Sequence, residues 1–313
     1  MEIPITQSKA WQNLQNDLGE KSFYEENDRF SYLAILKTTP VGNYLYCPYG
    51  PVANDKVAFK SALKDLKELA TKNQAFFIRI EPYDEAFEKA IPKNTKKSKD
   101  LNPKETWIID LKGKDEDLKA KLPSRLLRYH RQAEKKGITI ETSHNPSDIH
   151  YLLDLQKALA KKKGINTFSE KYLQTELAQP FSTLYLLKYR DPEEKNEEQK
   201  AVAAGLVFDD KKTRYNLQGA QNEIGRSLHA TGILTIQLIL DAKEKGLKTF
   251  DFWGIAPEGA SKNHPWAGFT AFKKTFAGTE VRHAGTYDVI LNSPKYHFYQ
   301  LIRRINRLKR KIK

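Results

Sequence analysis

The first third of the chain has a hydrophobic pattern that predicts two strands, a helix and a further strand. Strand-like apolar runs cover 31–37 and 43–47, and a Gly-Pro pair at 50–51 indicates a turn. Apolar residues at helical spacing follow over 59–69, and the run 75–82 predicts another strand. The predicted order is strand, strand, turn, helix, strand.

The second half of the chain repeats this order. About 30 residues separate Gly50 from Ile80, and about 30 separate Gly219 from Phe250. The repeat predicts an α/β protein with two related domains. Its elements are strands at 183–190, 201–208 and 214–218, a loop at 219–225, a helix at 233–243 and a strand at 249–254.

A lysine-rich segment without hydrophobic periodicity, at 91–104, predicts the boundary between the domains, because its prolines break helices. We expect a first domain at 1–105, completed by a C-terminal helix at 293–313, and a second domain at 106–292. In that helix an apolar stripe lies opposite a face of Arg and Lys. The polar run 191–200 predicts an exposed hairpin loop.

Composition indicates a globular protein with anionic partners. The 313 residues include 53 Lys and Arg against 39 Asp and Glu, a formal net charge of +14, and 39% of them are hydrophobic. This charge suits nucleic acid, phosphorylated substrates or acidic lipid headgroups. Lysine that only keeps the surface soluble explains it as well.

The single cysteine, Cys47, excludes an internal disulfide and suits a reducing compartment, where we expect it to be a buried hydrophobe. No Cys/His cluster has zinc-ligand spacing, so no metal site is predicted. No signal peptide is visible, and no apolar run approaches the roughly 20 residues of a membrane helix. We therefore expect a cytoplasmic protein, with peripheral membrane contact left open.

The segment 251–278 carries the strongest functional signal. Trp, Phe, Gly and His residues crowd around Phe272, Lys273 and Lys274, after a strand that ends near Gly254. Glycine and proline then indicate a loop, and the aromatic residues that follow have helical spacing. Because loops that leave buried strands often carry function, we expect a site here.

Several catalytic motifs are missing from the sequence. It has no GxSxG, HExxH or GxxxxGK[ST], which argues against an α/β-hydrolase, a zincin and a P-loop phosphotransferase. The repeated order of strands and helix is that of a GNAT acyltransferase domain. Neither candidate loop has the [RQ]xxGx[GA] form that binds the pyrophosphate of acyl-CoA, so another acyl donor is favoured.

Short motifs lie along nearly the whole chain. They are Gln7-Ser8 with Trp11, the YxPxGP turn of Tyr46, Pro48, Gly50 and Pro51, Arg79 with Glu81 and Pro82, the basic segment 122–138, residues 251–255, and the GxxxFKxxFxG pattern of Gly268, Phe272, Lys273, Phe276 and Gly278. In these motifs the chain resembles the Fem family of peptidoglycan-bridge aminoacyltransferases, in the short form without a coiled-coil arm. The resemblance implies two tandem GNAT-like (acyl-CoA N-acyltransferase-like) domains with mixed sheets, plus a basic C-terminal helix.

The resemblance also implies a reaction, with no cofactor. An amine on the stem peptide of a peptidoglycan precursor attacks the ester of aminoacyl-tRNA and forms the amide of an interpeptide bridge during cell wall biogenesis. A fixed cation stabilises the charge that develops, and the family's lysine maps onto Lys273, with Phe272 beside it. Glu81 is the expected acceptor of the amine's proton. Substrate contacts are expected, in the cleft between the domains, from Trp11, Arg79, Tyr172, Tyr215 and Trp253.

These residues also have structural alternatives. Lys273 suits the wet face of an amphipathic segment, and Glu81 suits an exposed strand end. Phe272, Tyr172 and Tyr215 are equally compatible with core packing. The chain departs from the family pattern at Asn13, Tyr49, Phe168 and Ala277. Asn13 and Phe168 leave the anchoring of the precursor phosphates unassigned.

Positive charge offers contacts to tRNA phosphate or to an anionic bilayer. The residues expected to make them are Lys274, Arg125, Arg128, Arg303, Arg304 and Arg307. Two other functions stay open: a diverged GNAT-like N-acyltransferase with another acyl donor, and a non-enzymatic protein that binds RNA or a membrane surface. The sequence does not determine the amino acid transferred, the acceptor residue, the oligomeric state, or whether the precursor is lipid-linked or UDP-linked MurNAc-pentapeptide.

Overall fold

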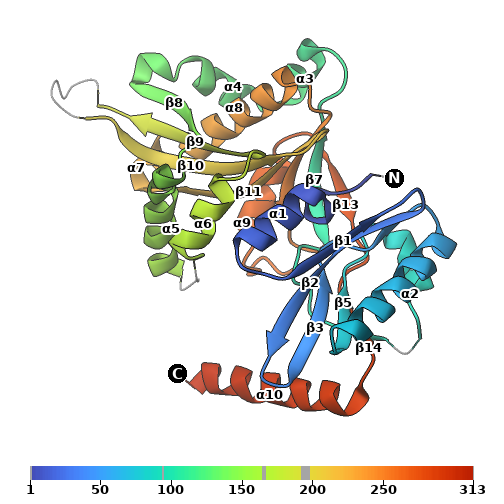
Figure 1. Ribbon diagram of the computed structural model, residues 1–313. Helices are drawn as coiled ribbons and strands as arrows, with labels where there is room; N and C mark the ends of the chain where they lie inside the picture. Colours follow the sequence, from blue (N-terminus) through green and yellow to red (C-terminus); the bar gives the residue numbers. More distant parts are fainter. Residues whose placement is uncertain (1, 94, 164–166, 192–197, 313) are drawn as a thin grey trace. The chain divides into compact units, whose positions relative to one another are not determined.

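Two compact units make up the chain. Unit 1 comprises Met1–Lys104 and Arg282–Lys313, and unit 2 comprises Glu105–Val281. Each unit is built around its own seven-stranded mixed sheet (Figure 1). The computed structural model describes residues 2–93, 95–163, 167–191 and 198–312, with the backbone alone for 161–163 and 308–312.

The sheet of unit 1 has the strand order β1-β2-β3-β5-β14-β6, and β4 pairs with β2. Strands β3 and β5 are parallel, whereas β2 and β3 are antiparallel. The elements are η1 (Ile5–Gln7), α1 (Lys9–Asp17), β1 (Ser22–Glu26), β2 (Phe30–Thr39), β3 (Gly42–Cys47), β4 (Val52–Ala53), α2 (Lys56–Lys72), β5 (Ala75–Ile80), η2 (Glu85–Ala90), β6 (Thr95–Lys97), β14 (Tyr287–Ile290) and α10 (Ser293–Ile312).

Helix α2 shows how the sequence builds this unit. Asp55 caps it by accepting hydrogen bonds from Val57 N at 2.8 Å and Ala58 N at 2.7 Å. Its apolar face, which includes Phe59 and Leu66, is buried in the core formed with β2, β3 and β5. The predicted order of strands and helix in the first third of the chain is confirmed.

The sheet of unit 2 has the order β13-β7-β12-β11-β10-β9-β8. Strands β10 and β11 are antiparallel and β11 and β12 are parallel, so the motif of unit 1 recurs. Helices α4 and α8 cover one face, and α5 and α6 cover the other (Figure 1). The elements are β7 (Glu105–Asp110), α3 (Asp115–Lys121), α4 (Ser124–Arg131), η3 (Glu134–Lys136), β8 (Ile138–Ser143), η4 (Pro146–Asp148), α5 (Ile149–Lys163), α6 (Glu170–Leu177), β9 (Ser182–Tyr189), β10 (Lys200–Asp209), β11 (Thr213–Gln221), α7 (Glu223–Ser227), α8 (Ala230–Glu244), β12 (Thr249–Gly254), α9 (Ala267–Lys274) and β13 (Thr279–Arg282).

Two segments predicted as loops contain regular structure. The segment 91–104 contributes β6, which pairs with β14. The segment 219–225 continues β11 and then forms α7, whose Gly225 N donates to the side chain of Asn222. Local polarity concealed β6, because edge pairing depends on a partner elsewhere in the chain, and the glycines concealed α7, although its cap at Asn222 is local. Of the predicted hairpin loop, residues 192–197 lie outside the described residues.

The last strand of the chain belongs to the first sheet. β14 pairs antiparallel with β5 and β6, which places 282–292 with unit 1, although the sequence pattern assigned this segment to the second domain. The local pattern could not identify a strand partner so distant in sequence. The domain bounds expected from the sequence, 1–105 with 293–313 and 106–292, stay a prediction.

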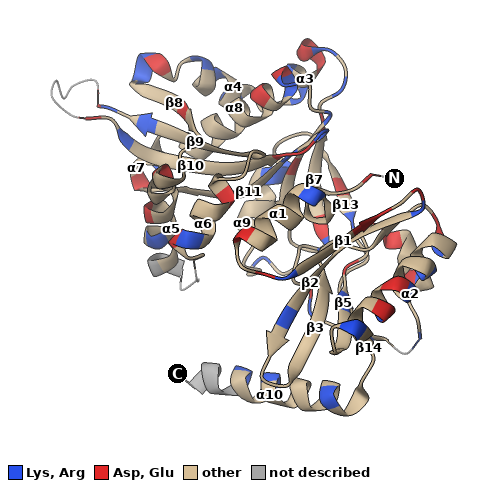
Figure 2. Ribbon diagram, in the orientation of Figure 1, with Lys and Arg blue, Asp and Glu red and all other residues tan. Residues whose placement is uncertain are grey.

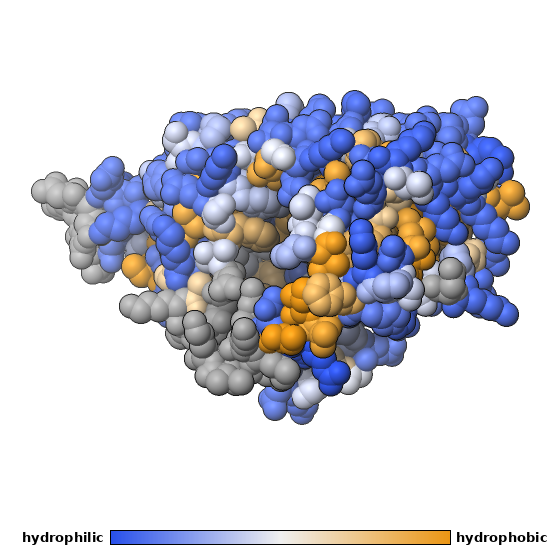
Figure 3. Space-filling view, turned by 60° about the horizontal axis from the view of Figure 1, so that its bottom comes forward, coloured by the Kyte–Doolittle hydropathy of each residue, from blue (hydrophilic) through white to orange (hydrophobic). Residues whose placement is uncertain are grey.

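Basic residues are spread over both units, and α10 has no acidic residue among those described (Figure 2). Hydrophobic surface also gathers in the region of α10 (Figure 3). No helix in the described ranges is both long and apolar enough to cross a membrane. Cys47 is fully buried in the core of unit 1, as predicted.

Candidate functional site

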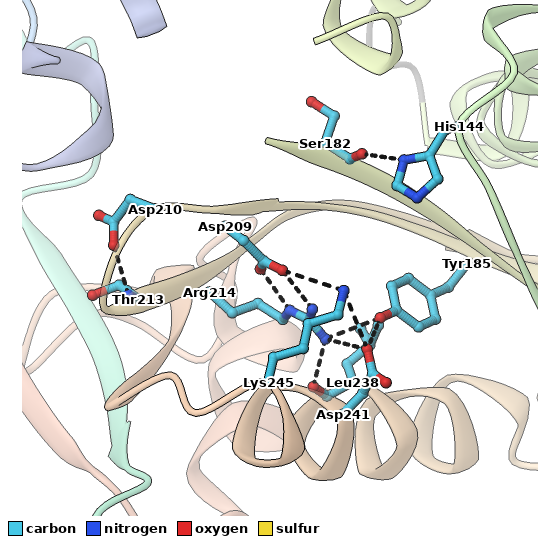
Figure 4. A network of polar contacts seen from close by, with 10 residues as sticks. All are labelled: His144, Ser182, Tyr185, Asp209, Asp210, Thr213, Arg214, Leu238, Asp241 and Lys245. Carbon is cyan, nitrogen blue, oxygen red and sulfur yellow. Dashed lines mark hydrogen bonds and ion pairs between the residues drawn. The ribbon is translucent and has the colours of Figure 1, made fainter. Parts of the chain in front are cut away.

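A buried arginine fixes the strand that borders the site in unit 2. Arg214 on β11 makes two hydrogen bonds to Asp209, at 2.7 and 2.6 Å, and one to Asp241 on α8, at 3.1 Å (Figure 4). Tyr185 on β9 donates to the same Asp241. Because the guanidinium is fully buried and multiply paired, it ties β10 and β11 firmly to α8.

Strands β11 and β12 separate partway along their length. They pair in parallel only from Thr213 and Thr249 to Tyr215 and Asp251, although β11 continues to Gln221. On its other side β12 pairs with β7, with a register shift between Asp251 and Gly254. The end of β12 is therefore free of β11 inside the sheet.

Trp253 lies at this separation in a left-handed conformation, with φ of 63°. A bulky residue rarely adopts this conformation, which costs about 1–3 kcal/mol and often occurs at functional sites. Its ring meets the ring of Tyr215 edge to face at 6.1 Å. Tyr215 is 4% exposed and donates to Asp210 at 2.9 Å, so the core holds this tyrosine in place.

Lys273 points back to the same strand end. It occupies the last turn of α9, and its Nζ donates to the carbonyl oxygen of Gly254 at 2.6 Å. Burial lowers the pKa of Lys273 to about 8, and the charge of Asp251 opposes this shift. The lysine is therefore a partly desolvated cation beside the opening of the sheet.

Asp251 is the acidic partner of Lys273. It is 3% exposed and accepts a hydrogen bond from Trp253 N at 2.7 Å. Burial raises the pKa of Asp251 to about 7, while the Trp253 hydrogen bond and the charge of Lys273 act against the shift. Two groups of opposite charge thus share one weakly solvated place, an arrangement common in catalytic sites.

The neighbours of Lys273 have packing roles. Phe272 packs against the core of unit 2, and its ring lies 5.3 Å from that of Phe276. Lys274 is exposed, with its Nζ 3.3 Å from Glu280 and over the ring of Trp107 at 5.3 Å. The two adjacent lysines therefore differ: one is desolvated beside β12, and the other lies in a surface ion pair.

Tyr172 lies in a second polar cluster of unit 2. Its ring stacks on Phe168 at 4.9 Å, and it hydrogen-bonds Glu176 one helical turn later. Glu176 is 2% exposed and accepts from Gln218 on β11 at 2.7 Å. Burial raises the pKa of Glu176 to about 8. The sequence pattern did not single out this carboxylate, which lies four residues after Tyr172.

The predicted residues of unit 1 are buried in polar networks. Glu81 is 3% exposed, which contradicts the exposed strand end considered above, and it accepts five hydrogen bonds. Arg79 is 2% exposed and binds Asp288 through two hydrogen bonds, at 2.7 and 2.8 Å. Trp11 is 7% exposed on α1. The donors to Glu81 are Leu101 N, Asn102 N, Asn102 Nδ2, Tyr46 OH and Thr286 Oγ1.

This geometry favours a structural role for Glu81 and Arg79. A carboxylate offers about four lone-pair sites, and the five donors already occupy those of Glu81, which leaves little room for a hydrogen bond to a substrate. Arg79 is held by a bidentate pair that a substrate would have to break. Their catalytic and substrate-binding roles stay predictions.

Helix α4 carries a cluster of cations around an aromatic ring. Arg125 Nε donates to Tyr129 OH at 2.7 Å, and the guanidinium of Arg128 and the ammonium of Lys136 lie 5.6 and 5.4 Å from the ring centroid. The ring of His229 stacks on Tyr129 at 5.1 Å. The hydrogen bond from Arg125 lowers the pKa of Tyr129. We call these five residues the α4 cluster.

The predicted basic residues on α10 lie elsewhere, in unit 1. Arg303, Arg304 and Arg307 are exposed, and Arg303 lies over the ring of Tyr299 at 5.5 Å. Among the described residues, no three His, Cys, Asp or Glu side chains come together as ligands for a metal ion.

The sequence matches one family model over most of its length. The model of the FemAB family matches residues 4–109 and 183–304. The chain belongs to the FemAB family. No curated protein sequence matches this FemAB chain.

Solved structures support the fold of this FemAB protein. A crystal structure of FemX has a TM-score of 0.80 and 20% sequence identity, over 96% of this chain and 94% of that chain. The C-terminal domain of a putative lysylphosphatidylglycerol synthetase from Agrobacterium fabrum has a TM-score of 0.57 and 15% identity, over 94% and 91% of the two chains. L-PGS from Bacillus licheniformis has a TM-score of 0.56 and 16% identity, over 94% and 95%.

These findings confirm the family and the fold class expected from the sequence: an α/β protein with two tandem GNAT-like domains, mixed sheets and a C-terminal helix. Membership of the FemAB family supports an acyltransferase. Of the predicted site residues, the structure gathers Tyr215, Trp253 and Lys273 around the end of β12, and Phe272 packs against the core of unit 2. Asp251 was missed, although it is the single acid within the apolar run TFDFWG.

Proposed function

We propose that this FemAB protein transfers an amino acid from aminoacyl-tRNA to an amine on the stem peptide of a peptidoglycan precursor. The observation that carries this proposal is the Lys273–Asp251 pair at the separation of β11 and β12. Family membership supports the acyl-transfer class, and the desolvated lysine supplies the cation that this reaction requires.

The reaction needs a charge stabiliser more than a nucleophile of the protein. The acceptor amine attacks the ester carbonyl, a C–N bond forms, and the carbonyl oxygen becomes negative. The bond to the ribose oxygen then breaks, the nitrogen loses one proton, and the ribose oxygen gains one. An ammonium near both oxygens lowers the barrier by about 3–4 kcal/mol, the value of one good oxyanion donor.

Lys273 is the group we assign to this step. Its pKa of about 8 keeps most molecules protonated near neutral pH, yet makes the lysine more acidic than one in water. It can therefore stabilise the oxyanion and hand its proton to the ribose oxygen. Asp251 is a positioning residue in this scheme, because its charge holds the lysine in the protonated form.

The α4 cluster supplies contacts for the donor RNA. Arg125, Arg128 and Lys136 carry positive charge around a single tyrosine ring, and His229 adds a second aromatic surface. RNA ends are commonly bound by cations on phosphates together with aromatic rings that stack on bases. Three of the five predicted substrate contacts, Tyr172, Tyr215 and Trp253, lie in the same unit.

The test is a transfer assay with purified protein. Total tRNA charged with radiolabelled amino acids is supplied with UDP-linked or lipid-linked MurNAc-pentapeptide, and label in the precursor is measured. We expect transfer with one of these acceptors and its loss in Lys273→Ala. Absence of transfer to both acceptors, with every labelled amino acid, would refute the proposal.

Two further arms separate the alternatives. Acetyl-CoA in place of charged tRNA tests a GNAT-like N-acyltransferase with another donor. Phosphatidylglycerol as acceptor tests a lipid product, since one structural neighbour is described as the C-terminal domain of a putative lysylphosphatidylglycerol synthetase. Transfer in either arm, without transfer to the precursor, would replace the proposed substrate.

A further inference from the structure

Helix α10 presents a stripe of large hydrophobic side chains to solvent. Phe298, Leu301 and Ile305 are 57%, 52% and 43% exposed. At about 100° per residue they share one side of the helix, about 180° from Tyr296. The hydrophobic surface in the region of α10 is visible in Figure 3. Amphipathic helices of globular proteins normally bury such a stripe, so this one needs a partner.

The opposite side of α10 is firmly anchored. Tyr296 and Tyr299 are 2% and 8% exposed and pack with Phe76 and Phe77 on β5. Tyr296 OH donates to Asp288 at 2.8 Å, which joins the helix to the buried network of Arg79. Since the anchored face cannot turn outward without breaking this network, the apolar stripe is a fixed feature of unit 1.

The charge of α10 selects among partners. The helix sequence contains no Asp or Glu, and Arg303, Arg304 and Arg307 are exposed. An RNA would use this charge but not the apolar stripe. A second copy of α10 would cover the stripe but would bring like charges together. An anionic bilayer uses both features. The basic positions of the helix are Lys295, Arg303, Arg304, Arg307, Lys309, Arg310 and Lys311.

The contrast with α4 supports this choice. In α4 the hydrophobic Leu126 and Leu127 pack against the core of unit 2, and the charges surround Tyr129. Helix α4 therefore offers charge and an aromatic ring, whereas α10 offers charge and exposed aliphatic surface. Basic residues with an exposed hydrophobic stripe are typical of helices that lie in a membrane interface.

We propose that α10 docks unit 1 on the surface of an anionic lipid bilayer. The stripe of Phe298, Leu301 and Ile305 inserts at the boundary between headgroups and acyl chains. The arginines lie toward the other side of the helix, and their positive charge attracts the anionic surface over about one Debye length. The helix lies on the membrane and does not cross it. This inference concerns lipid binding alone and does not depend on the proposed reaction.

Vesicle co-sedimentation of the full chain tests this docking surface. We expect binding to phosphatidylglycerol–phosphatidylcholine vesicles, and binding at least about tenfold weaker to phosphatidylcholine alone. Phe298→Ser/Leu301→Ser/Ile305→Ser should weaken binding to the anionic vesicles by about tenfold or more. Arg303→Gln/Arg304→Gln/Arg307→Gln should weaken it by a similar factor and reduce its dependence on anionic lipid.

Matched controls keep the test specific. Val57 and Leu101 in unit 1 are 64% and 49% exposed, so Val57→Ser/Leu101→Ser removes comparable hydrophobic surface and should bind vesicles as the wild type does. Arg125→Gln/Arg128→Gln removes charge from α4 and should also leave vesicle binding unchanged. Circular dichroism and thermal melting of every variant confirm that it is folded.

Four results would overturn the proposal. The first is no vesicle binding by the wild type, and the second is unchanged binding by the folded apolar triple variant. The third is a wild-type dimer in ultracentrifugation that the apolar variant abolishes while vesicle binding persists, which would assign the stripe to a second copy. Loss of RNA binding by the arginine variant, with vesicle binding intact, would equally assign the charge to RNA.

Discussion

The strand that follows the helix of the repeated motif carries a buried acid in both units, in two contrasting environments. In unit 1 this strand is β5, and Glu81, just beyond it, accepts five hydrogen bonds. In unit 2 it is β12, and Asp251 has one described hydrogen bond, from Trp253 N, together with the nearby charge of Lys273. Corresponding strands of the two units thus bring a carboxylate with five donors just beyond β5 and a buried acid with one described donor within β12.

The difference indicates that a duplicated fold can use a buried acid for stability in one unit and for chemistry in the other. Five donors join Glu81 to the surrounding segments of unit 1, so this carboxylate contributes to the fold. Asp251 accepts one described hydrogen bond, and its charge raises the pKa of Lys273. Both residues lie where β12 stops pairing with β11. We therefore expect changes at the unit 1 acid to alter stability, and changes at the unit 2 pair to alter chemistry.

The largest expected effect is on the rate of transfer in Lys273→Ala. Removing one cation from the oxyanion should reduce kcat about 100-fold to 1000-fold, while the protein stays folded. Single-turnover transfer from charged tRNA measures this loss. Lys274→Ala is the matched control, because Lys274 lies in a surface ion pair, and it should retain transfer within about twofold. Equal losses in both variants would mean that Lys273 and Lys274 do not differ in their contribution to transfer.

The next effect is on stability, in Glu81→Gln. The glutamine amide cannot accept the hydrogen bonds that one carboxylate oxygen accepts, so the free energy of unfolding should fall by about 1–3 kcal/mol. Urea denaturation measures this change, and kcat per folded molecule should be unchanged. A fall in kcat of about 100-fold with intact stability would instead make Glu81 the general base and erase the contrast between the units.

A smaller effect is expected on the pH dependence of stability in Asp251→Asn. The pKa of Asp251 is raised to about 7, so between pH 4 and 7 the folded state keeps a proton that the unfolded state loses. The wild type should therefore lose stability as pH rises through this range, by about 1.4 kcal/mol per unit of pKa shift at most. The variant should lack this loss, and its stability relative to wild type should grow from pH 4 to 7 in urea titrations. A constant difference would mean that Asp251 titrates normally.

The smallest effect is a shift in the pH–rate profile of the same variant. In the wild type the rate should decline above pH 8, where Lys273 loses its proton. Asp251 raises the pKa of Lys273, so its removal should move this alkaline limb to lower pH and reduce the rate at pH 7.5 a few-fold. An unmoved limb would separate Asp251 from the chemistry.

Much of the fold could be predicted from the sequence, because the repeated motifs are local. The helical spacing of α2 and α8 and the apolar runs of β2, β3, β5, β10 and β12 appear within short windows. Strands β6 and β14 could not be assigned in this way, since their partners come from distant segments. Pairing of this kind depends on the finished sheet and not on local pattern.

The same limit applies to the candidate site: its local features were visible in the sequence, and its contacts between distant segments were not. The aromatic segment around Lys273 was visible because glycine, proline and aromatic residues crowd one short stretch. The burial of Glu81 and Arg79 was not visible, because their partners Thr286 and Asp288 lie more than 200 residues away. Asp251 looked like one acid in a strand, and its importance emerged only from its burial and from the lysine of α9.

The return of β14 to the first sheet has a consequence for biosynthesis. Arg79 pairs with Asp288, which is translated 209 residues later. Unit 2 is one continuous segment and can fold while the ribosome is still at work, since domains generally fold as units from the N-terminal side. Unit 1 cannot complete its sheet until the last strand emerges, so its half-built edge at β5 is the part of the nascent chain that chaperones have most reason to cover.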